Sequence, residues 1–172
     1  MRRVAISVVG IAVLLGVCGG GAQVYGQAGA AAPAAAPAPP APKDKTAYWA
    51  DTEIQSVWKD LEARQVINKR VAEGGSFSIN IRIVKEGDAP LQHATSADVW
   101  VVQAGTATAV TDGTMVDPVK RPNVDDIAGK SITGGTERAL KAGDILYIPP
   151  GVPHGFKNIK GFRAFLIRFD TK

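Results

Sequence analysis

The feature of this sequence that most constrains its fold is a turn of prolines and glycine between two apolar segments near the C-terminal end. Residues 144–148 are predicted to form a short buried strand. Pro149 and Pro150 end it, since proline cannot donate to a strand ladder, and Gly151 permits a positive φ. His154 follows where the chain can enter a sheet again. We therefore expect this turn to hold one imidazole in a fixed position, as a ligand or catalytic group is held.

The spacing of this stretch resembles the second conserved motif of the cupin superfamily. That motif is a glycine, five residues, a proline, one residue, a glycine, two residues, a histidine, three residues and an asparagine. Every fixed position is filled here, by Gly143, Pro149, Gly151, His154 and Asn158. The chain is therefore similar to the cupins over a specific, multi-residue signature.

The resemblance predicts a first cupin motif upstream, and residues 91–105 contain a modified copy. The family pattern is a histidine, one residue, a histidine, three or four residues, a glutamate, six residues and a glycine. His93 matches the second histidine, Asp98 stands in the place of the glutamate, and Leu91 replaces the first histidine. The resemblance thus implies a metal site at His93, Asp98 and His154 that departs from the family pattern at two ligand positions.

Short segments of β character predict the architecture. Residues 77–83 alternate isoleucine with polar side chains, which places the two sets on opposite faces of a strand. Residues 98–103 and 106–110 are predicted as two strands joined by a hairpin at Ala104-Gly105, and residues 162–169 as a final strand. This pattern favours a sandwich or small barrel. The cupin resemblance implies an all-β, jelly-roll β-barrel (double-stranded β-helix) with one N-terminal α-helix.

The predicted helix spans residues 51–64, where an apolar stripe recurs at helical spacing through Ile54, Trp58 and Leu61. We expect this stripe to pack against a sheet; the alternative is a homodimer interface. No strand is predicted between residues 111 and 141. That long segment is expected to be either a lid over the barrel mouth or a plain surface excursion.

The N-terminal region predicts export. A basic start precedes an uncharged apolar run at residues 4–18, too short for a membrane span and typical of a signal peptide. We assign residues 1–22 to a signal peptide, 23–43 to an Ala/Pro-rich linker and 44–172 to the cupin domain. The mature protein is expected in the periplasm or outside the cell. A lipoprotein-like sequence ends at Cys18, and the alternative is therefore a lipid attached to Cys18 that would anchor the protein to a membrane.

The charge distribution excludes one class of partner. The net charge of +4 at pH 7 includes Arg2, Arg3 and Lys43 of the N-terminal region, so the predicted domain is close to neutral. It contains no basic block interleaved with aromatic residues, and nucleic acid is not implied as a partner.

The predicted site suits a small molecule. Two histidines and a carboxylate are a ligand set for Mn, Fe, Ni or Zn that leaves coordination positions open. Four further residues are predicted to line the ligand pocket, with Arg82 facing either a substrate carboxylate or solvent: Arg82, Leu91, Trp100 and Phe156. Cupins include dioxygenases, isomerases, decarboxylases and lyases as well as proteins that only bind, so the resemblance leaves catalysis open. The alternative function is a metal-free module that binds or senses a small ligand.

Overall fold

The structure, a computed structural model, describes residues 39–122 and 124–171. The predicted signal peptide, Cys18 and most of the predicted linker lie outside these residues, so those predictions stand untested. Within the described residues, no helix has both the length and the apolar character needed to cross a membrane.

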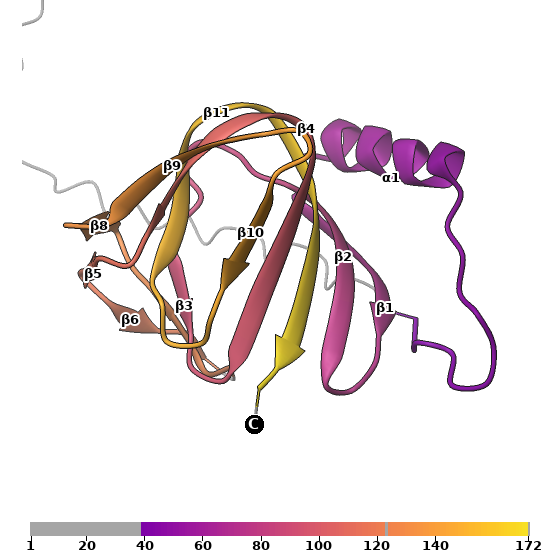
Figure 1. Cartoon of the computed structure of the whole chain (residues 1–172), viewed down its shortest axis with the longest axis horizontal. Helices are drawn as coiled ribbons and strands as arrows, with labels where there is room; N and C mark the ends of the chain where they lie inside the picture. Colours follow the sequence, from indigo (N-terminus) through magenta and orange to yellow (C-terminus); the bar gives the residue numbers. More distant parts are fainter. Residues whose placement is uncertain (1–38, 123, 172) are drawn as a thin grey trace, which may run out of the picture. The chain divides into compact units, whose positions relative to one another are not determined.

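One helix and eleven strands make up the described domain, and Figure 1 shows their arrangement. In chain order they are α1 (Asp51–Ala63), β1 (Asn68–Glu73), β2 (Phe77–Ile83), β3 (Leu91–His93), β4 (Ser96–Thr111), β5 (Thr114–Val116), β6 (Val119–Lys120), β7 (Asp126–Ala128), β8 (Ser131–Thr133), β9 (Thr136–Lys141), β10 (Ile145–Ile148) and β11 (His154–Asp170). The two long strands β4 and β11 pair with each other along most of their lengths. The strands curve into a cupin-type jelly-roll barrel, which confirms the predicted fold class.

All strand pairs of the barrel are antiparallel. β11 pairs with β2 along its second half, β1 adds to the outer edge of β2, and β3, β7 and β6 continue the sheet from the start of β11. On the other side, β4 pairs with β10 through its first half and with β9 through its second half. The start of β11 therefore lies between β3 and β4, the two strands that carry the first cupin motif.

The predicted hairpin at Ala104-Gly105 is wrong, because β4 runs unbroken from Ser96 to Thr111. Gly105 has a φ of +72° and bends the strand instead of ending it. A Cβ at this position would lie 2.3 Å from the carbonyl oxygen of Gly161 in β11. The glycine thus serves a close approach of two long strands, and the paired register shifts in this region.

The two faces of β2 have different roles, as the alternation predicted. Ile81 and Ile83 point outward and are covered by α1, whose Trp58 and Leu61 are buried against them. Trp58 also stacks on Phe165 of β11, with ring centroids 5.6 Å apart. The amphipathic helix is confirmed as packing against a sheet. The polar residues of β2 consequently face the barrel interior.

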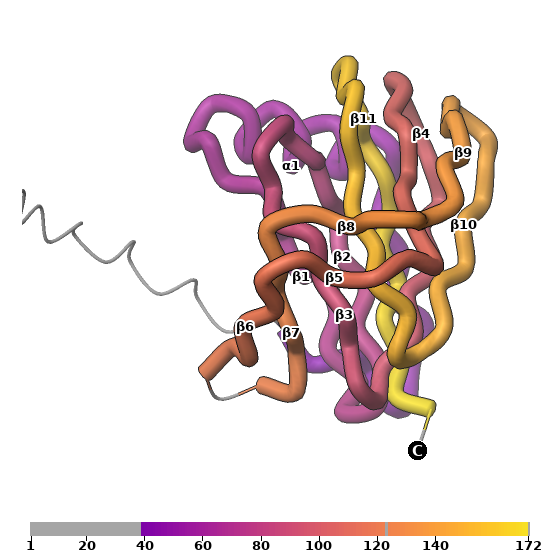
Figure 2. Tube along the Cα trace, turned by 90° about the vertical axis from the view of Figure 1, so that its left-hand side faces the viewer, coloured from indigo at the N-terminus to yellow at the C-terminus, as the bar shows by residue number. Residues whose placement is uncertain are grey.

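The expectation of a long loop without strands at residues 111–141 is wrong. This segment contains β5 to β9, and Figure 2 shows β5 and β8 side by side, crossing the direction of the barrel strands. β7 pairs with β3 at the position of His93. β5 to β8 have two or three residues each, too few to show a period in the sequence. β9 has six residues, but Leu140 is its one buried residue, so no alternation of apolar and polar side chains marked it.

A cluster of buried apolar side chains from β4, β9, β10 and β11 packs inside the barrel. It includes Trp100, Val102, Leu140, Ile148 and Phe162. The candidate site lies beside this cluster, where β3 meets the start of β11.

Candidate metal and ligand site

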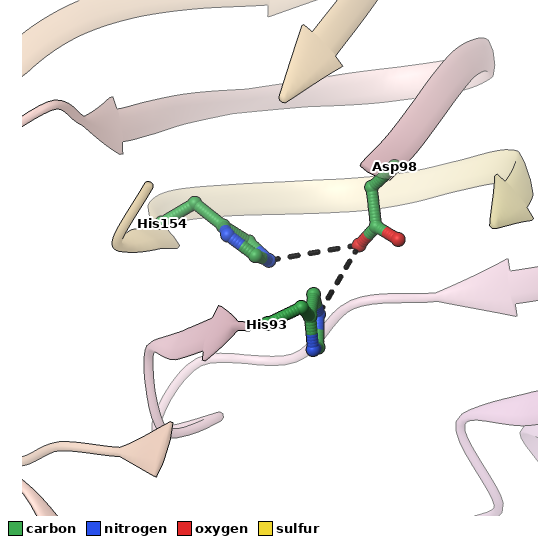
Figure 3. Close-up of side chains that lie close together, drawn as sticks. All are labelled: His93, Asp98 and His154. Carbon is green, nitrogen blue, oxygen red and sulfur yellow. Dashed lines mark ion pairs between the residues drawn. The ribbon is translucent and has the colours of Figure 1, made fainter. Parts of the chain in front are cut away.

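Three side chains converge from three strands at the barrel's polar end. His93 comes from β3, Asp98 from β4 and His154 from the start of β11, and Figure 3 shows both imidazoles directed at the same carboxylate oxygen. Oδ2 of Asp98 lies 3.4 Å from Nε2 of His93 and 3.6 Å from Nε2 of His154. All three residues are buried. The structure thus brings together the ligand set that the resemblance implied.

The turn before His154 joins the two motifs. Gly151 has a φ of +77°, and its N–H donates to the backbone carbonyl of His93 at 2.7 Å. His154 then begins β11, where it pairs with Leu91 of β3 and Thr111 of β4. The position of each imidazole is therefore set by backbone hydrogen bonds that connect the turn to β3.

His93 has a second carboxylate partner that the sequence did not reveal. Nδ1 of His93 lies 2.6 Å from Oδ1 of Asp126 on the neighbouring strand β7. A carboxylate accepts the proton of Nδ1 and leaves Nε2 with its lone pair directed at Asp98. Asp126 falls in the segment where no strand was predicted, so no periodic signal marked it.

His154 is held in the same tautomer by its own backbone neighbourhood. Nδ1 of His154 lies 3.1 Å from the carbonyl oxygen of Val152, which can only accept a hydrogen bond. Burial lowers the pKa of His154 to about 4, although the Asp98 carboxylate acts in the opposite direction. His154 is therefore neutral at pH 7, and its Nε2 lone pair also points toward Asp98.

Arg168 is the second side chain at the candidate site that sequence reasoning missed. Its Nε donates to Oδ1 of Asp98 at 2.7 Å and its Nη2 donates to Oδ2 at 2.9 Å, a bidentate pair. The same Nη2 lies 2.6 Å from Nε2 of His93. One signal was present: Arg168 continues the inward face of β11 after the buried Ala164 and Leu166, where an apolar residue would be expected.

The charge state of Asp98 follows from these contacts. Burial by itself would raise the pKa of Asp98, but the hydrogen bonds and positive charge of Arg168 act in the opposite direction, and that pKa lies well below its usual range. Asp98 is consequently an anion at all ordinary pH values. The buried anion between two imidazole lone pairs is neutralised by the Arg168 guanidinium.

Two of the three separations between candidate ligand atoms are close to those of a divalent transition metal site. Donor atoms about 2.1 Å from one ion, at angles of roughly 90–110°, lie about 3.0–3.4 Å apart. The separations of 3.4 and 3.6 Å from Oδ2 of Asp98 are close to that range. One ligand atom from each of the three residues lies within 4.8 Å of the others. The Asp98 carboxylate therefore reaches both histidines, although aspartate is shorter than glutamate.

A cavity of about 300 Å³ opens beside the triad. The cavity is lined by Asp98 and His154 and by all four residues that were predicted to line a ligand pocket, Arg82, Leu91, Trp100 and Phe156. The Trp100 and Phe156 rings pack with centroids 4.8 Å apart and form an aromatic wall. This volume is at the lower end of those of small-molecule sites.

Arg82 faces this cavity and not open solvent. Its side chain is 19% exposed, and its Nη2 lies 3.9 Å from Oδ2 of Asp88, too far for a hydrogen bond. Burial lowers the pKa of Arg82, and Asp88 offsets this only in part. Among the described residues, the buried Nε of Arg82 and Nε1 of Trp100 have no hydrogen-bond partner. The cavity wall thus contains unpaired donors.

The fold and site define a cupin-type barrel with a candidate centre of two histidines and one carboxylate. A family model described as the JmjC domain (JmjC_2) matches residues 59–162, and the chain belongs to this family of the cupin superfamily. The matched range includes all three triad residues; Arg168 lies beyond it. A comparison with curated proteins found no significant match.

Solved structures similar to this chain have low sequence identity to it. A Bacillus halodurans protein is 10% identical with a TM-score of 0.46, over 67% of this chain and 79% of that chain. An RmlC-like cupin family protein from Methanocaldococcus jannaschii is 15% identical with a TM-score of 0.41, over 60% and 78% of the two chains. Hydroquinone 1,2-dioxygenase from Sphingomonas sp. TTNP3 is 15% identical with a TM-score of 0.43, over 60% and 64%.

Proposed function

We propose that this domain binds a divalent transition metal through His93, Asp98 and His154 and uses it to hold a small molecule in the barrel cavity. One observation carries the proposal. Both imidazoles have Nδ1 tied to an acceptor, Asp126 for His93 and the Val152 carbonyl for His154. Both Nε2 lone pairs therefore converge on a carboxylate, which is the preorganisation of metal-ligating histidines.

A metal bound there would supply a Lewis acid for a ligand oxygen. The chain's own residues would orient the rest of the ligand. Trp100 and Phe156 offer apolar surface, while Arg82 offers a guanidinium with a buried, unpartnered Nε. Guanidinium groups bind carboxylates through two parallel hydrogen bonds. A small molecule with an aromatic or aliphatic body and one anionic group fits these walls.

Titration calorimetry of the described domain with Mn, Fe, Ni and Zn tests the metal. Asp98→Asn and Asp88→Asn form a matched pair, because both aspartates line the cavity but Asp98 alone belongs to the triad. We expect wild type and Asp88→Asn to bind one ion per chain, and Asp98→Asn and His154→Ala to lose binding. Absence of binding to wild type at millimolar metal would reject the metal site.

Arg168 supports a second candidate function. Its guanidinium already neutralises Asp98, so the cavity could hold a small ligand with no metal at all. The two candidates share the anion site at Arg82. Benzoate and its neutral analogue benzamide are suitable probes, with binding measured by tryptophan fluorescence. We expect wild type to bind benzoate more tightly than benzamide and Arg82→Met to lose this preference. Equal affinity of wild type for the two probes would contradict an anion site.

We also propose that the mature protein is exported. The support is the apolar run at residues 4–18 and the Ala/Pro-rich stretch that follows it. Intact mass of the protein purified from its native cell tests this. Loss of about 22 residues indicates cleavage by a signal peptidase, whereas a start at Cys18 with added acyl mass indicates a lipid anchor. A full-length cytoplasmic chain would contradict both.

A further inference from the structure

The guanidinium of Arg168 is in contact with two of the three candidate metal ligands. Its Nη2 lies 2.6 Å from Nε2 of His93 and 2.9 Å from Oδ2 of Asp98. These are the same two atoms that the proposed metal would use. The Arg168 guanidinium thus occupies the position that the proposed metal ion would take beside His93 and Asp98.

Arg168 and a metal ion cannot use these atoms together. The Nη2 hydrogens point into the lone pairs of His93 and Asp98, and a bound ion would need the same lone pairs. Arginine has no acceptor and does not deprotonate in proteins, so it cannot become a ligand itself. Two positive charges at this separation would also repel each other strongly in a buried site.

We propose that Arg168 is a built-in competitor for the metal site, which holds His93 and Asp98 when no ion is bound and leaves them when a divalent ion enters. This inference rests on the proposed metal site and adds the residue that regulates its affinity. The consequence is a site weaker than its three ligands alone would make it. A metal then loads only when its binding outweighs the loss of the Arg168 contacts.

The surroundings of Arg168 allow this movement. Its side chain is 27% exposed, and it lines the cavity beside the triad, so the guanidinium has room on that side. Asp126 and Asp170 are close enough for their charges to act on Arg168. A displaced guanidinium would therefore still have carboxylates near it, and entry of the metal ion would not leave the Arg168 charge buried and unpaired.

An ordinary structural ion pair is the competing interpretation, and it predicts different mutant behaviour. If Arg168 only stabilises Asp98, its removal should weaken the fold and leave metal affinity equal or lower. If Arg168 competes with the ion, its removal should destabilise the metal-free protein but strengthen metal binding. The two effects have opposite signs, so one variant separates them.

The test uses Arg168→Met, with Arg168→Gln as a second variant whose amide can still donate to Asp98. Arg82→Met is the matched control, because it removes the same charge from the same cavity without touching His93 or Asp98. Calorimetric titration with Mn, Ni and Zn gives the affinities. Thermal unfolding with and without metal gives a second readout through linkage.

We expect both Arg168 variants to bind metal roughly tenfold or more tightly than wild type, with a clearly smaller gain for Arg82→Met. The unfolding temperature of metal-free Arg168→Met should be below that of wild type, and its rise on adding metal should be larger. If wild type binds metal and the Arg168 variants bind it no better, the competitor is rejected while the metal site stands. If no folded variant binds metal, both proposals fail.

Discussion

Nδ1 of His93 and Oδ1 of Asp126 lie 2.6 Å apart across the adjacent strands β3 and β7. This contact links the first cupin motif to a segment in which the sequence showed no regular structure. Asp126 also receives a contact from Arg121, whose Nη1 lies 3.4 Å from Oδ2. The carboxylate is thereby oriented toward the imidazole and fixes its tautomer.

Asp126→Asn is expected to lower metal affinity by roughly ten- to a hundredfold, because a neutral amide is a weaker acceptor for the Nδ1 proton and makes Nε2 a poorer ligand. Asp125→Asn is the control: its carboxylate lies on the surface, 3.4 Å from Nζ of Lys120. Calorimetric titration of both variants with Zn measures the difference. Equal affinities for the two variants would show that Asp126 does not support the site.

Leu91→His is expected to restore the imidazole that the family pattern has at this position. Leu91 shares a face of β3 with His93 and pairs with His154, so the new side chain would enter the cavity beside the triad. A fourth ligand should raise affinity for Mn, Fe, Ni or Zn by roughly ten- to a hundredfold. Metal-free stability should fall, because leucine packing is lost.

The control for this gain is His154→Ala in the Leu91→His background. Removal of one original ligand should abolish the increase if the new imidazole acts at the same ion. Titration of wild type, each single variant and the double variant completes the cycle. An increase that survives in the double variant would place the ion elsewhere.

The domain should lose stability as the pH falls from about 6.5 to about 4. His154 has an ordinary pKa of 6.5 that burial lowers to about 4 in the folded protein. Between these values the unfolded chain binds more protons than the folded one, so the free energy of unfolding decreases toward acid, by up to about 1.4 kcal/mol per pH unit. Below pH 4 this contribution levels off.

Urea unfolding of wild type and His154→Gln between pH 4 and 7.5 measures this effect. Glutamine does not titrate, so the variant should show a smaller slope over the same window. Identical slopes for the two proteins would mean that His154 does not carry the pH dependence. The comparison is made without metal, since a bound ion would itself oppose protonation.

Gly151→Val is expected to destabilise the domain by roughly 1–3 kcal/mol and to reduce metal content. The cause is the φ of +77° and not crowding, because a Cβ there would have no atom within 4 Å. Gly151→Asn is the matched variant, since asparagine tolerates the left-handed region better than a β-branched residue. Thermal unfolding and elemental analysis should rank glycine above asparagine above valine. Equal stability of all three would show that the turn imposes no such constraint.

Local sequence patterns were sufficient for an all-β sandwich or small barrel with one helix, whereas the jelly roll and the three candidate ligands came from the resemblance to cupin motifs. The alternation in residues 77–83 placed isoleucine on one face of β2 and polar side chains on the other, because side chains of a strand alternate whatever it packs against. The helix at Asp51–Ala63 followed from an apolar stripe for the same local reason. The histidine and aspartate positions followed from motif spacing, since turns and strand ends set them within a few residues.

Tertiary structure alone decided what surrounds those ligands. Asp126 reaches His93 from 33 residues away, and Arg168 reaches Asp98 and His93 from 70 and 75 residues away. Such contacts depend on the register between strands, which is set by the packing of the whole barrel and has no local signature. The continuity of β4 through Gly105 has the same origin, because the approach of β11 holds the glycine in an extended, bent strand where a turn was expected.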